Sequence, residues 1–255
     1  MPMLTLKSAL PEWIFFDCFN TLIDDFDDTG DESGLGPLFY LPVEAGFYTT
    51  ETDFKRDYDE WRKLEWSGNG WDEVELSSRL RAVLMKRDAS REDEIEALVD
   101  EMLGYFKKGY PKTLRLTSGV CEMLRAWHGK VKMGVVSNFF LAGAPEHFLM
   151  KFGLSGFFEF ILDSAKFGFK KPDPRIYFES LRSAGLAANR AKTVLFIGDN
   201  LINDILTPVR LNMRAIYFDR SADRPSWKSP SQIQFITHWD QFRPESFTAD
   251  YQSSH

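Results

Sequence analysis

The sequence has few cysteines and no dense cluster of basic residues. It has two cysteines, Cys18 and Cys121, in 255 residues. Both stand among apolar neighbours, which favours buried, reduced thiols and fits a cytosolic setting. The formal net charge is −7, and no segment has the density of lysine and arginine that marks a nucleic-acid-binding surface. We therefore expect no nucleic-acid partner.

Signals for secretion and membrane insertion are also missing. No apolar run approaches the roughly 20 residues that a membrane-spanning helix needs. The first residues show no basic segment followed by an apolar stretch and a cleavage site. We expect a cytoplasmic protein with no membrane partner. Hydrophobic residues make up 44% of the chain, which is enough for a sizeable core in one large or two modest domains.

The first strongly patterned stretch is the apolar run of residues 13–16, which ends at Asp17. Asn20 and Thr21 then turn the chain away. A run that is apolar on both faces is typical of a strand buried between layers of helices. Ligands bind at the carboxyl ends of such strands in open α/β sheets. Asp17 is therefore a candidate reactive group on its position alone.

Residues from about 38 to 108 are predicted to be helical. Apolar residues recur there at helical spacing, a cap is expected at residues 50–53, and Ser90 is expected to cap the third helix. No strand pattern interrupts this block, which predicts an all-helical insertion. We expect its tryptophans to pack in its core, as aromatic residues usually do. They are Trp61, Trp66 and Trp71.

From about residue 112, short strands alternate with helices. The predicted strands are 131–136, 158–162, 193–197, 214–218 and an edge strand at 233–236. The predicted helices of this region are 118–128, 145–152, 174–184 and one that runs from after Asp199 to Leu211. In the helical insertion, a helix is predicted over residues 72–87. The alternation predicts an α/β fold with a doubly wound parallel sheet, formed by residues 1–24 and 112–255, with residues 25–111 as a separate helical domain.

Right-handed crossovers would bring the carboxyl ends of these strands to one edge of the sheet. Four polar clusters are expected there: Asp17 with Thr21, Ser137 with Asn138, Lys170 with Lys171, and Asp199 with Asp204. In the chain they read DCFNTL (17–22), VSN (136–138), KPDP (171–174) and GDNLIND (198–204).

The order and spacing of these clusters resemble the four motifs of the haloacid dehalogenase (HAD) superfamily. Those motifs are Asp-x-Asp-x-Thr after a buried strand, a Ser or Thr ending the next strand, a Lys often in Lys-Pro-Asp-Pro, and Gly-Asp-x4-Asp. The helical insertion resembles, in position and type, the C1 cap of this superfamily. The resemblance implies a Rossmann-like core with an inserted all-helical cap domain.

The resemblance and the chemistry of the residues imply the same roles. Asp17 would attack as a carboxylate nucleophile and form a covalent aspartyl intermediate. Ser137 would hold a phosphate oxygen or a substrate carboxylate. Lys171 would neutralise the anion, with Lys170 as the alternative. Thr21 would hydrogen-bond to the transferred group.

Two acids of the fourth motif suggest a metal. Asp199 and Asp204 are expected in the same crevice as Asp17. Three like charges that close cannot all stay ionised without a counter-charge. One lysine is a poor match for three anions, whereas Mg²⁺ takes carboxylates plus substrate phosphate. The resemblance implies Mg²⁺ bound by Asp17, the Phe19 backbone carbonyl and Asp204 or Asp199. Alternatively, Asp199 caps the following helix.

Position 19 departs from the phosphatases of the superfamily. There it is an Asp that acts as general acid and base, a contribution of roughly 10²–10⁴-fold. The 2-haloacid dehalogenases carry an aromatic residue at this position, as Phe19 is here. Those enzymes, however, need no metal and have Ser where this chain has Asp199. We give the fourth motif more weight, because an extra carboxylate would repel the nucleophile of a metal-free enzyme.

We therefore expect a Mg²⁺-dependent hydrolase acting on a small phosphorylated metabolite. The first alternative is a 2-haloacid dehalogenase, for which Arg56 and Arg62 are candidate cap cations for the substrate carboxylate. The second is a non-catalytic binding protein that lost turnover at Phe19.

Asn138 would orient the substrate or serve only as a turn residue. No feature of the sequence indicates an oligomeric state.

Overall fold

The α/β part of the molecule is built on a six-stranded sheet. The computed structural model describes residues 9–25, 36–67, 70–221 and 233–247. The strand order is β5-β4-β1-β6-β7-β8, and every neighbouring pair is parallel. The strands are β1 (Trp13–Phe16), β4 (Lys132–Ser137), β5 (Phe160–Asp163), β6 (Val194–Gly198), β7 (Arg214–Phe218) and β8 (Phe235–Ile236). The predicted doubly wound parallel sheet is confirmed.

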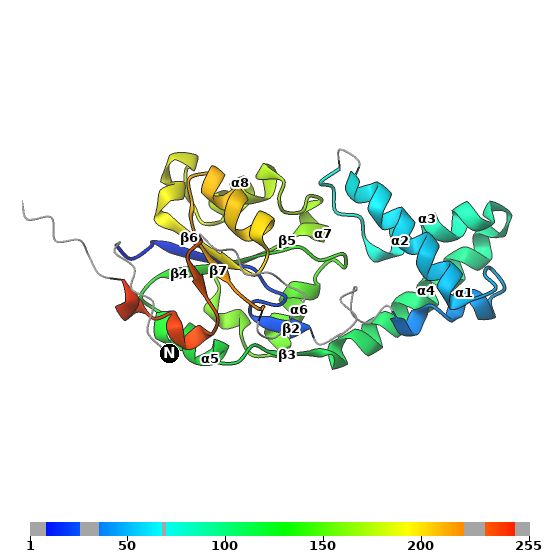
Figure 1. Cartoon of the computed structure of the whole chain (residues 1–255), viewed down its shortest axis with the longest axis horizontal. Helices are drawn as coiled ribbons and strands as arrows, with labels where there is room; N and C mark the ends of the chain where they lie inside the picture. Colours follow the sequence, from blue (N-terminus) through cyan, green and yellow to red (C-terminus); the bar gives the residue numbers. More distant parts are fainter. Residues whose placement is uncertain (1–8, 26–35, 68–69, 222–232, 248–255) are drawn as a thin grey trace, which may run out of the picture.

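Helices cover both faces of the sheet, with α8 on one side and α5 and α6 on the other (Figure 1). They are α5 (Val120–Trp127), α6 (Ala144–Lys151), α7 (Ser164–Phe167), α8 (Pro174–Ser183) and α9 (Thr207–Arg210). Ile14 and Phe16 pack in the cluster that contains α5 and α6, whereas Trp13 and Phe15 pack in the cluster that contains α8. Both faces of β1 are therefore buried, which explains its uniformly apolar sequence.

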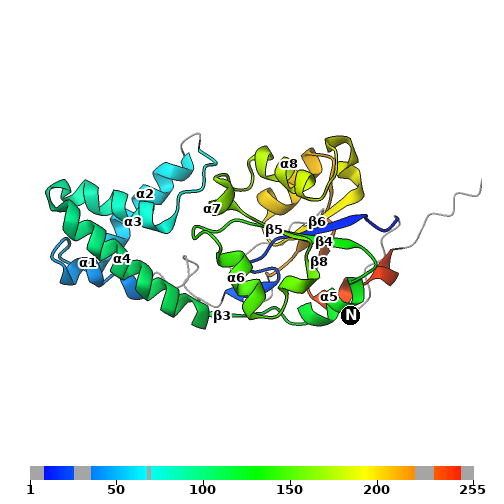
Figure 2. The same cartoon turned by 180° about the vertical axis from the view of Figure 1, so that it is seen from behind.

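The predicted helical insertion is present and extends away from the sheet (Figure 2). Its helices are α1 (Leu41–Glu44), α2 (Glu51–Ser67), α3 (Leu76–Arg87) and α4 (Glu92–Gly109). The Asp53 amide donates to the Thr50 hydroxyl at 3.2 Å, as predicted for the start of α2. The cap predicted at Ser90 is wrong, because its amide donates to the Asp88 side chain at 3.1 Å in a short turn before α4.

The tryptophans of the insertion differ from one another. Trp61 packs against the hydrophobic core as expected, and the side chain of Trp66 lies outside the part of the chain that is described. The expectation for Trp71 is wrong, since this side chain is 44% exposed. The reason is that α3 begins at Leu76 rather than at residue 72, so residues 70–75 are not part of a helix.

Two strands were not predicted. β2 (Ile23–Asp25) and β3 (Leu114–Leu116) form an antiparallel pair at the junction of the two parts. Each is three residues long and its pairing partner is about 90 residues away in the chain, so neither has a local pattern. After Asp199 the predicted helix begins as a π-helical turn, Leu201–Leu206, before α9. No helix among the described residues is long and apolar enough to cross a membrane.

Gly134 in β4 tests how tightly the sheet packs. A Cβ at this position would overlap the ring of Phe160, whose centroid lies 5.2 Å from that of Phe15. We expect Gly134→Ala to lower the free energy of unfolding by about 1–3 kcal/mol, as overpacking of a dense core does. The measurement is the midpoint of urea unfolding followed by circular dichroism.

Gly104→Ala is the matched control for this change. The added Cβ at Gly104 in α4 meets no described atom within 4 Å, and alanine favours a helix over glycine by up to about 1 kcal/mol. Its unfolding midpoint should stay or rise. Equal midpoints for both variants would contradict the packing described for Gly134.

Candidate active site

The carboxyl ends of β1, β4 and β6 meet at one edge of the sheet, and a polar side chain follows each of them. The Asp17 amide donates to the Ile197 carbonyl at 2.8 Å, which extends the pairing of β1 with β6 by one residue. Asn20 then has a φ of 60°, a left-handed conformation that asparagine tolerates better than most residues. This turn brings the Thr21 hydroxyl to 3.0 Å from the Asp17 carboxylate.

Lys171 connects two acids of the site. Its Nζ lies 2.7 Å from Asp17 Oδ1 and 2.7 Å from Asp204 Oδ1, and its side chain is 2% exposed. Burial lowers the pKa of Lys171, but the two carboxylates outweigh burial and raise the pKa above its ordinary value. The lysine is therefore held in its charged form between both acids. Of the two lysines considered from the sequence, Lys171 is the one that contacts Asp17.

Asn138 holds the backbone of Lys171. Its Nδ2 donates to the Lys171 carbonyl at 2.8 Å, and its Oδ1 accepts from the Lys171 amide at 2.7 Å. An asparagine amide can pair in this way with the N–H and C=O of one residue because it offers both a donor and an acceptor. Asn138 thus positions the backbone of Lys171, and its role in orienting the substrate stays a prediction.

Ser137 and Cys18 are buried, Cys18 as the sequence suggested, whereas Cys121 is only partly buried, so the expectation of a buried thiol is wrong for Cys121. Ser137 is the last residue of β4, and its side chain is fully buried. Cys18 and Cys121 are free thiols. Burial, and after it the Asp17 carboxylate, raise the pKa of the Cys18 thiol well above its ordinary value, so this thiol is unreactive. The role of Ser137 as an anion ligand stays a prediction.

Three carboxylates gather around the end of β6 and β1. Asp17, Asp199 and Asp204 each offer one oxygen, and these oxygens lie within 4.8 Å of one another. Burial raises the pKa of Asp204 to about 6, with Asp17 adding to the rise and Lys171 opposing it. Removal from bulk water, and then the two neighbouring acids, raise the pKa of Asp199 well above its ordinary value. Burial is the largest cause of both shifts, and the charge of the neighbouring carboxylates adds to it.

The loop after β6 fixes the position of Asp204. The Asn200 amide donates to Asp204 Oδ2 at 2.9 Å, and a Cβ at Gly198 would overlap the Asp204 carboxylate. The helical turn is capped by Asn200, whose side chain accepts from the amides of Ile202 and Asn203. The alternative that Asp199 caps this turn is therefore wrong.

Asp199 instead turns toward Thr21, whose hydroxyl lies 3.2 Å from Asp199 Oδ1. The Thr21 hydroxyl thus lies within hydrogen-bond distance of the carboxylates of both Asp17 and Asp199. This contact completes the link between the end of β1 and the end of β6. A divalent cation with oxygen ligands fits this donor set, because the acids outnumber the one lysine that contacts them.

Phe19 contributes its ring to packing. The ring stacks on Phe139 with 4.4 Å between centroids and lies 6.2 Å from the ring of Tyr110, which follows α4. It carries no group that can transfer a proton. The role of the Phe19 backbone carbonyl as a metal ligand stays a prediction.

The segment 70–76 of the helical insertion lies against the site, which the sequence analysis missed. The Lys170 amide donates to the Trp71 carbonyl at 2.8 Å, and the Leu76 amide donates to the Phe140 carbonyl at 2.8 Å. A cavity of about 500 Å³ beside Lys171 is lined by residues of this segment, of α2 and of the sheet loops. The predicted helix began at residue 72, inside this segment, so the local pattern did not indicate that residues 70–75 precede α3.

The cation candidates separate clearly. Arg62 lines the cavity beside Lys171, whereas Arg56 is 57% exposed and bonds to Asp53 at 2.8 Å.

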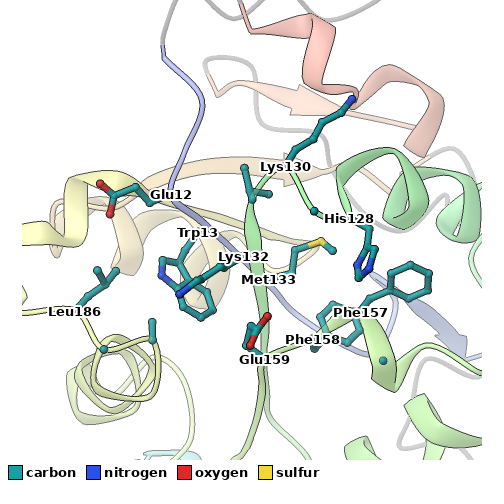
Figure 3. Close-up of a pocket in the computed structure, with 15 residues that line it drawn as sticks. Glu12, Trp13, His128, Lys130, Lys132, Met133, Phe157, Phe158, Glu159 and Leu186 are labelled. Carbon is teal, nitrogen blue, oxygen red and sulfur yellow. The ribbon is translucent and has the colours of Figure 1, made fainter.

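Another cavity, of about 750 Å³, opens at the opposite end of the sheet, where Trp13 and Lys132 lie at the starts of β1 and β4 (Figure 3). Ligands of open α/β sheets bind at the carboxyl ends of the strands, so the cavity beside Lys171 is the candidate substrate cavity.

Comparison with known proteins identifies the family. The family model described as haloacid dehalogenase-like hydrolase matches residues 75–218, which is more than half of the chain. The chain belongs to the haloacid dehalogenase-like hydrolases, as the four motifs predicted.

Individual relatives are distant. The chain is 27% identical over 211 residues to the pyrimidine 5'-nucleotidase YjjG of Escherichia coli, a match that covers 82% of this chain and 86% of that protein. Among solved structures, a 2-haloacid dehalogenase from Pseudomonas syringae superposes with a TM-score of 0.67 at 21% identity, over 93% of this chain and 98% of that one. A structure described as a HAD-hydrolase, YfnB from Bacillus subtilis, bound to magnesium, superposes with a TM-score of 0.58 at 17% identity, over 91% and 97%. These superpositions establish a shared fold.

The raised pKa of Asp204 predicts how stability depends on pH. A carboxyl group whose pKa rises from 3.8 to about 6 on folding binds a proton more tightly in the folded chain than in the unfolded chain. Its contribution to the free energy of unfolding therefore falls as the pH rises from about 4 to about 6, by roughly 2–3 kcal/mol.

The difference in unfolding free energy between the wild type and Asp204→Asn, measured by urea titration in chelator, isolates this contribution. We expect the wild type to lose stability relative to the variant between pH 4 and pH 7. A difference that is the same at both pH values would show that Asp204 is ionised throughout.

Proposed function

We propose that this protein is a Mg²⁺-dependent phosphate hydrolase of the cytoplasm that acts on a small phosphorylated metabolite. The observation that carries the proposal is the set of three carboxylates, Asp17, Asp199 and Asp204, gathered at the carboxyl edge of the sheet. The similarity to a pyrimidine 5'-nucleotidase and the magnesium in the structure of YfnB support it. We also propose the domain division given above, with 1–24 and 112–255 as the core and 25–111 as the cap.

In the first step, a carboxylate oxygen of Asp17 attacks phosphorus, and the ester P–O bond breaks. The leaving group departs with the bonding electrons, and the phosphoryl group is left on Asp17 as an aspartyl phosphate. In the second step, water attacks phosphorus, releases inorganic phosphate and restores Asp17. Lys171 stabilises the negative charge that develops on the phosphoryl oxygens, and Ser137 is proposed to bind one of these oxygens.

Asp17, Asp199, Asp204 and the Phe19 carbonyl would hold Mg²⁺. When bound, the metal supplies positive charge that offsets the carboxylates and the transferred phosphoryl group. Thr21 keeps Asp17 and Asp199 in place through its hydroxyl, and Asn138 does the same for Lys171. The proton for the leaving group must come from water, since Phe19 cannot donate one.

The first test is hydrolysis of p-nitrophenyl phosphate. We expect release of p-nitrophenol with Mg²⁺, loss of this activity in chelator, and loss of at least about 10³-fold in Asp17→Asn, because an amide is not a nucleophile. Asp24→Asn is the matched control, since Asp24 is a nearby buried acid whose partner is Arg220. Full activity in chelator would contradict the proposal.

The second test follows from the absent acid at position 19. Without protonation of the leaving group, the rate should depend steeply on the acidity of the alcohol or phenol that departs. We expect kcat/KM for alkyl phosphates to lie about 10²–10⁴-fold below that for p-nitrophenyl phosphate, the size of the missing acid contribution. A series of substituted phenyl phosphates gives the slope, and equal rates across the series would contradict this mechanism.

A 2-haloacid dehalogenase is the second candidate, favoured by the aromatic residue at position 19. A halide leaves without a proton, so Phe19 would be no handicap. In that reaction Asp17 displaces the halide to form an ester that water then hydrolyses. Halide release from 2-chloropropionate in chelator would support this candidate, and no release from a panel of 2-haloacids would exclude it.

A non-catalytic binding protein is the third candidate. It would bind Mg²⁺ or phosphate, seen as a rise in the unfolding temperature, with no turnover of phosphates or haloacids. Turnover that is lost in Asp17→Asn would exclude it.

A further inference from the structure

A further cavity, which we call the junction cavity, lies where the helical insertion meets the sheet. It has a volume of about 350 Å³. The end of α4 and the turn after it form one wall, and the loop after β4 forms the other together with α6. These elements lie next to each other in Figure 2. A ligand in the junction cavity would therefore contact both parts of the fold.

A layer of aromatic rings separates the junction cavity from the candidate substrate cavity. The two cavities have no lining residue in common. Tyr110 and Phe106 line the junction cavity, and their ring centroids lie 5.4 Å from that of Phe139 and 5.5 Å from that of Phe140, respectively. Phe139 and Phe140 line the candidate substrate cavity. A ligand of the junction cavity is therefore not a substrate placed for reaction at Asp17.

Buried aromatic side chains form the apolar side of the junction cavity. Phe106, Tyr110 and Phe148 line it, and all three are buried. The ring of Tyr110 is stacked on that of Phe106 with 4.9 Å between centroids and lies 5.8 Å from that of Phe148. The Gly143 amide donates to Asp163 Oδ2 at 2.5 Å, which fixes the loop at the edge of the cavity. The result is a preformed apolar surface that suits a flat ring.

The polar side of the junction cavity is basic. Lys107 and His147 line it and are exposed, and none of the described lining residues is acidic. In the described part of the chain, neither of these side chains has an ion pair or a hydrogen bond, whereas Glu146, the neighbour of His147, is paired with Lys166 at 2.7 Å. A carboxylate on a ligand would pair with the ammonium group of Lys107 and accept a hydrogen bond from the imidazole of His147.

The rings of the junction cavity also hold Phe19. The ring centroids of Tyr110 and Phe148 each lie 6.2 Å from that of Phe19, and Phe19 stands two residues after Asp17. The shape of the cavity depends on the position of α4 relative to α6, because each contributes to a wall. A bound ligand would favour the arrangement that it fits best, and this arrangement determines how Phe19 is packed.

We propose that the junction cavity is a regulatory site for a small aromatic carboxylate. The ring of the ligand packs on Tyr110 and Phe148, and its carboxylate pairs with Lys107 and His147. A volume of about 350 Å³ is near the lower limit for small-molecule sites, which restricts the ligand to one or two fused rings. The regulatory part of this inference rests on the proposed function, whereas the binding part does not.

Calorimetric titration with 2-naphthoate and with the uncharged 2-naphthamide tests the binding part. We expect a Kd of about 1 mM or tighter for 2-naphthoate, as its size allows, and binding of 2-naphthamide about 3–5-fold weaker, the size of an exposed ion pair. Lys107→Met should remove the difference between the two compounds. Lys108→Met is the matched control and should keep it, because Lys108 follows Lys107 in α4, is exposed and does not line the cavity.

Equal affinities of the wild type for the two compounds would overturn the inference. A difference that persists in Lys107→Met would overturn it too, because the carboxylate would then be bound at another place. Thermal unfolding of both lysine variants checks that the fold is intact.

Hydrolysis of p-nitrophenyl phosphate tests the regulatory part. We expect saturating 2-naphthoate to change kcat of the wild type at least about twofold, and Lys107→Met to need about 3–5-fold more 2-naphthoate for half of this change. An unchanged kcat, or inhibition that excess substrate overcomes, would overturn the regulatory role. Calorimetry needs no turnover, so a protein that binds 2-naphthoate at Lys107 but hydrolyses no phosphate contradicts the proposed function and still supports the binding site.

Discussion

The ammonium group of Lys171, placed between two buried carboxylates, is the interaction on which the rest of the site depends. Removing one partner from such a buried pair costs about 3–5 kcal/mol, because a charge is left without compensation. The end of β1 must therefore hold Asp17, the loop after β6 must hold Asp204, and Asn138 must hold the lysine backbone. The two contacts of 2.7 Å that Lys171 Nζ makes, one with Asp17 and one with Asp204, therefore constrain β1, β4, β6 and the loops that follow them.

The same constraint explains how much could be predicted from the sequence. The buried strands and the four polar clusters are local patterns, and parallel pairing alone brings the clusters together. The use of Asn138 depends on a residue 33 positions away, and β2 depends on β3 across the whole helical insertion. Trp71 shows the limit most clearly. An aromatic residue between two helices usually packs in the core. The Trp71 carbonyl instead accepts a hydrogen bond from the Lys170 amide, and Trp71 lines the cavity beside Lys171.

Phe19 links the chemistry to the contact between the helical insertion and the sheet. Its ring stacks on Phe139 and approaches Tyr110 at the end of α4, whose hydroxyl donates to Asp25 at 3.2 Å. Aromatic pairs of this kind contribute about 0.5–1.5 kcal/mol each beyond the area they bury. An aspartate at position 19 could not make these contacts. The side chain that would protonate a leaving group has been replaced by one that packs the junction.

Charge also restricts how any substrate reaches Asp17. Three carboxylates and one lysine carry a formal charge of −2 when all are ionised, and Lys171 already contacts two of the acids. A phosphate dianion or a haloacid anion would both be repelled by this surplus. Either a bound cation or a proton on Asp199, whose pKa is raised well above its ordinary value, must reduce it first. A proton leaves the cluster with a formal charge of −1, whereas a divalent cation brings it to zero. Under the proposed function, the occupant of the carboxylate cluster therefore sets how strongly a substrate anion is repelled from Asp17.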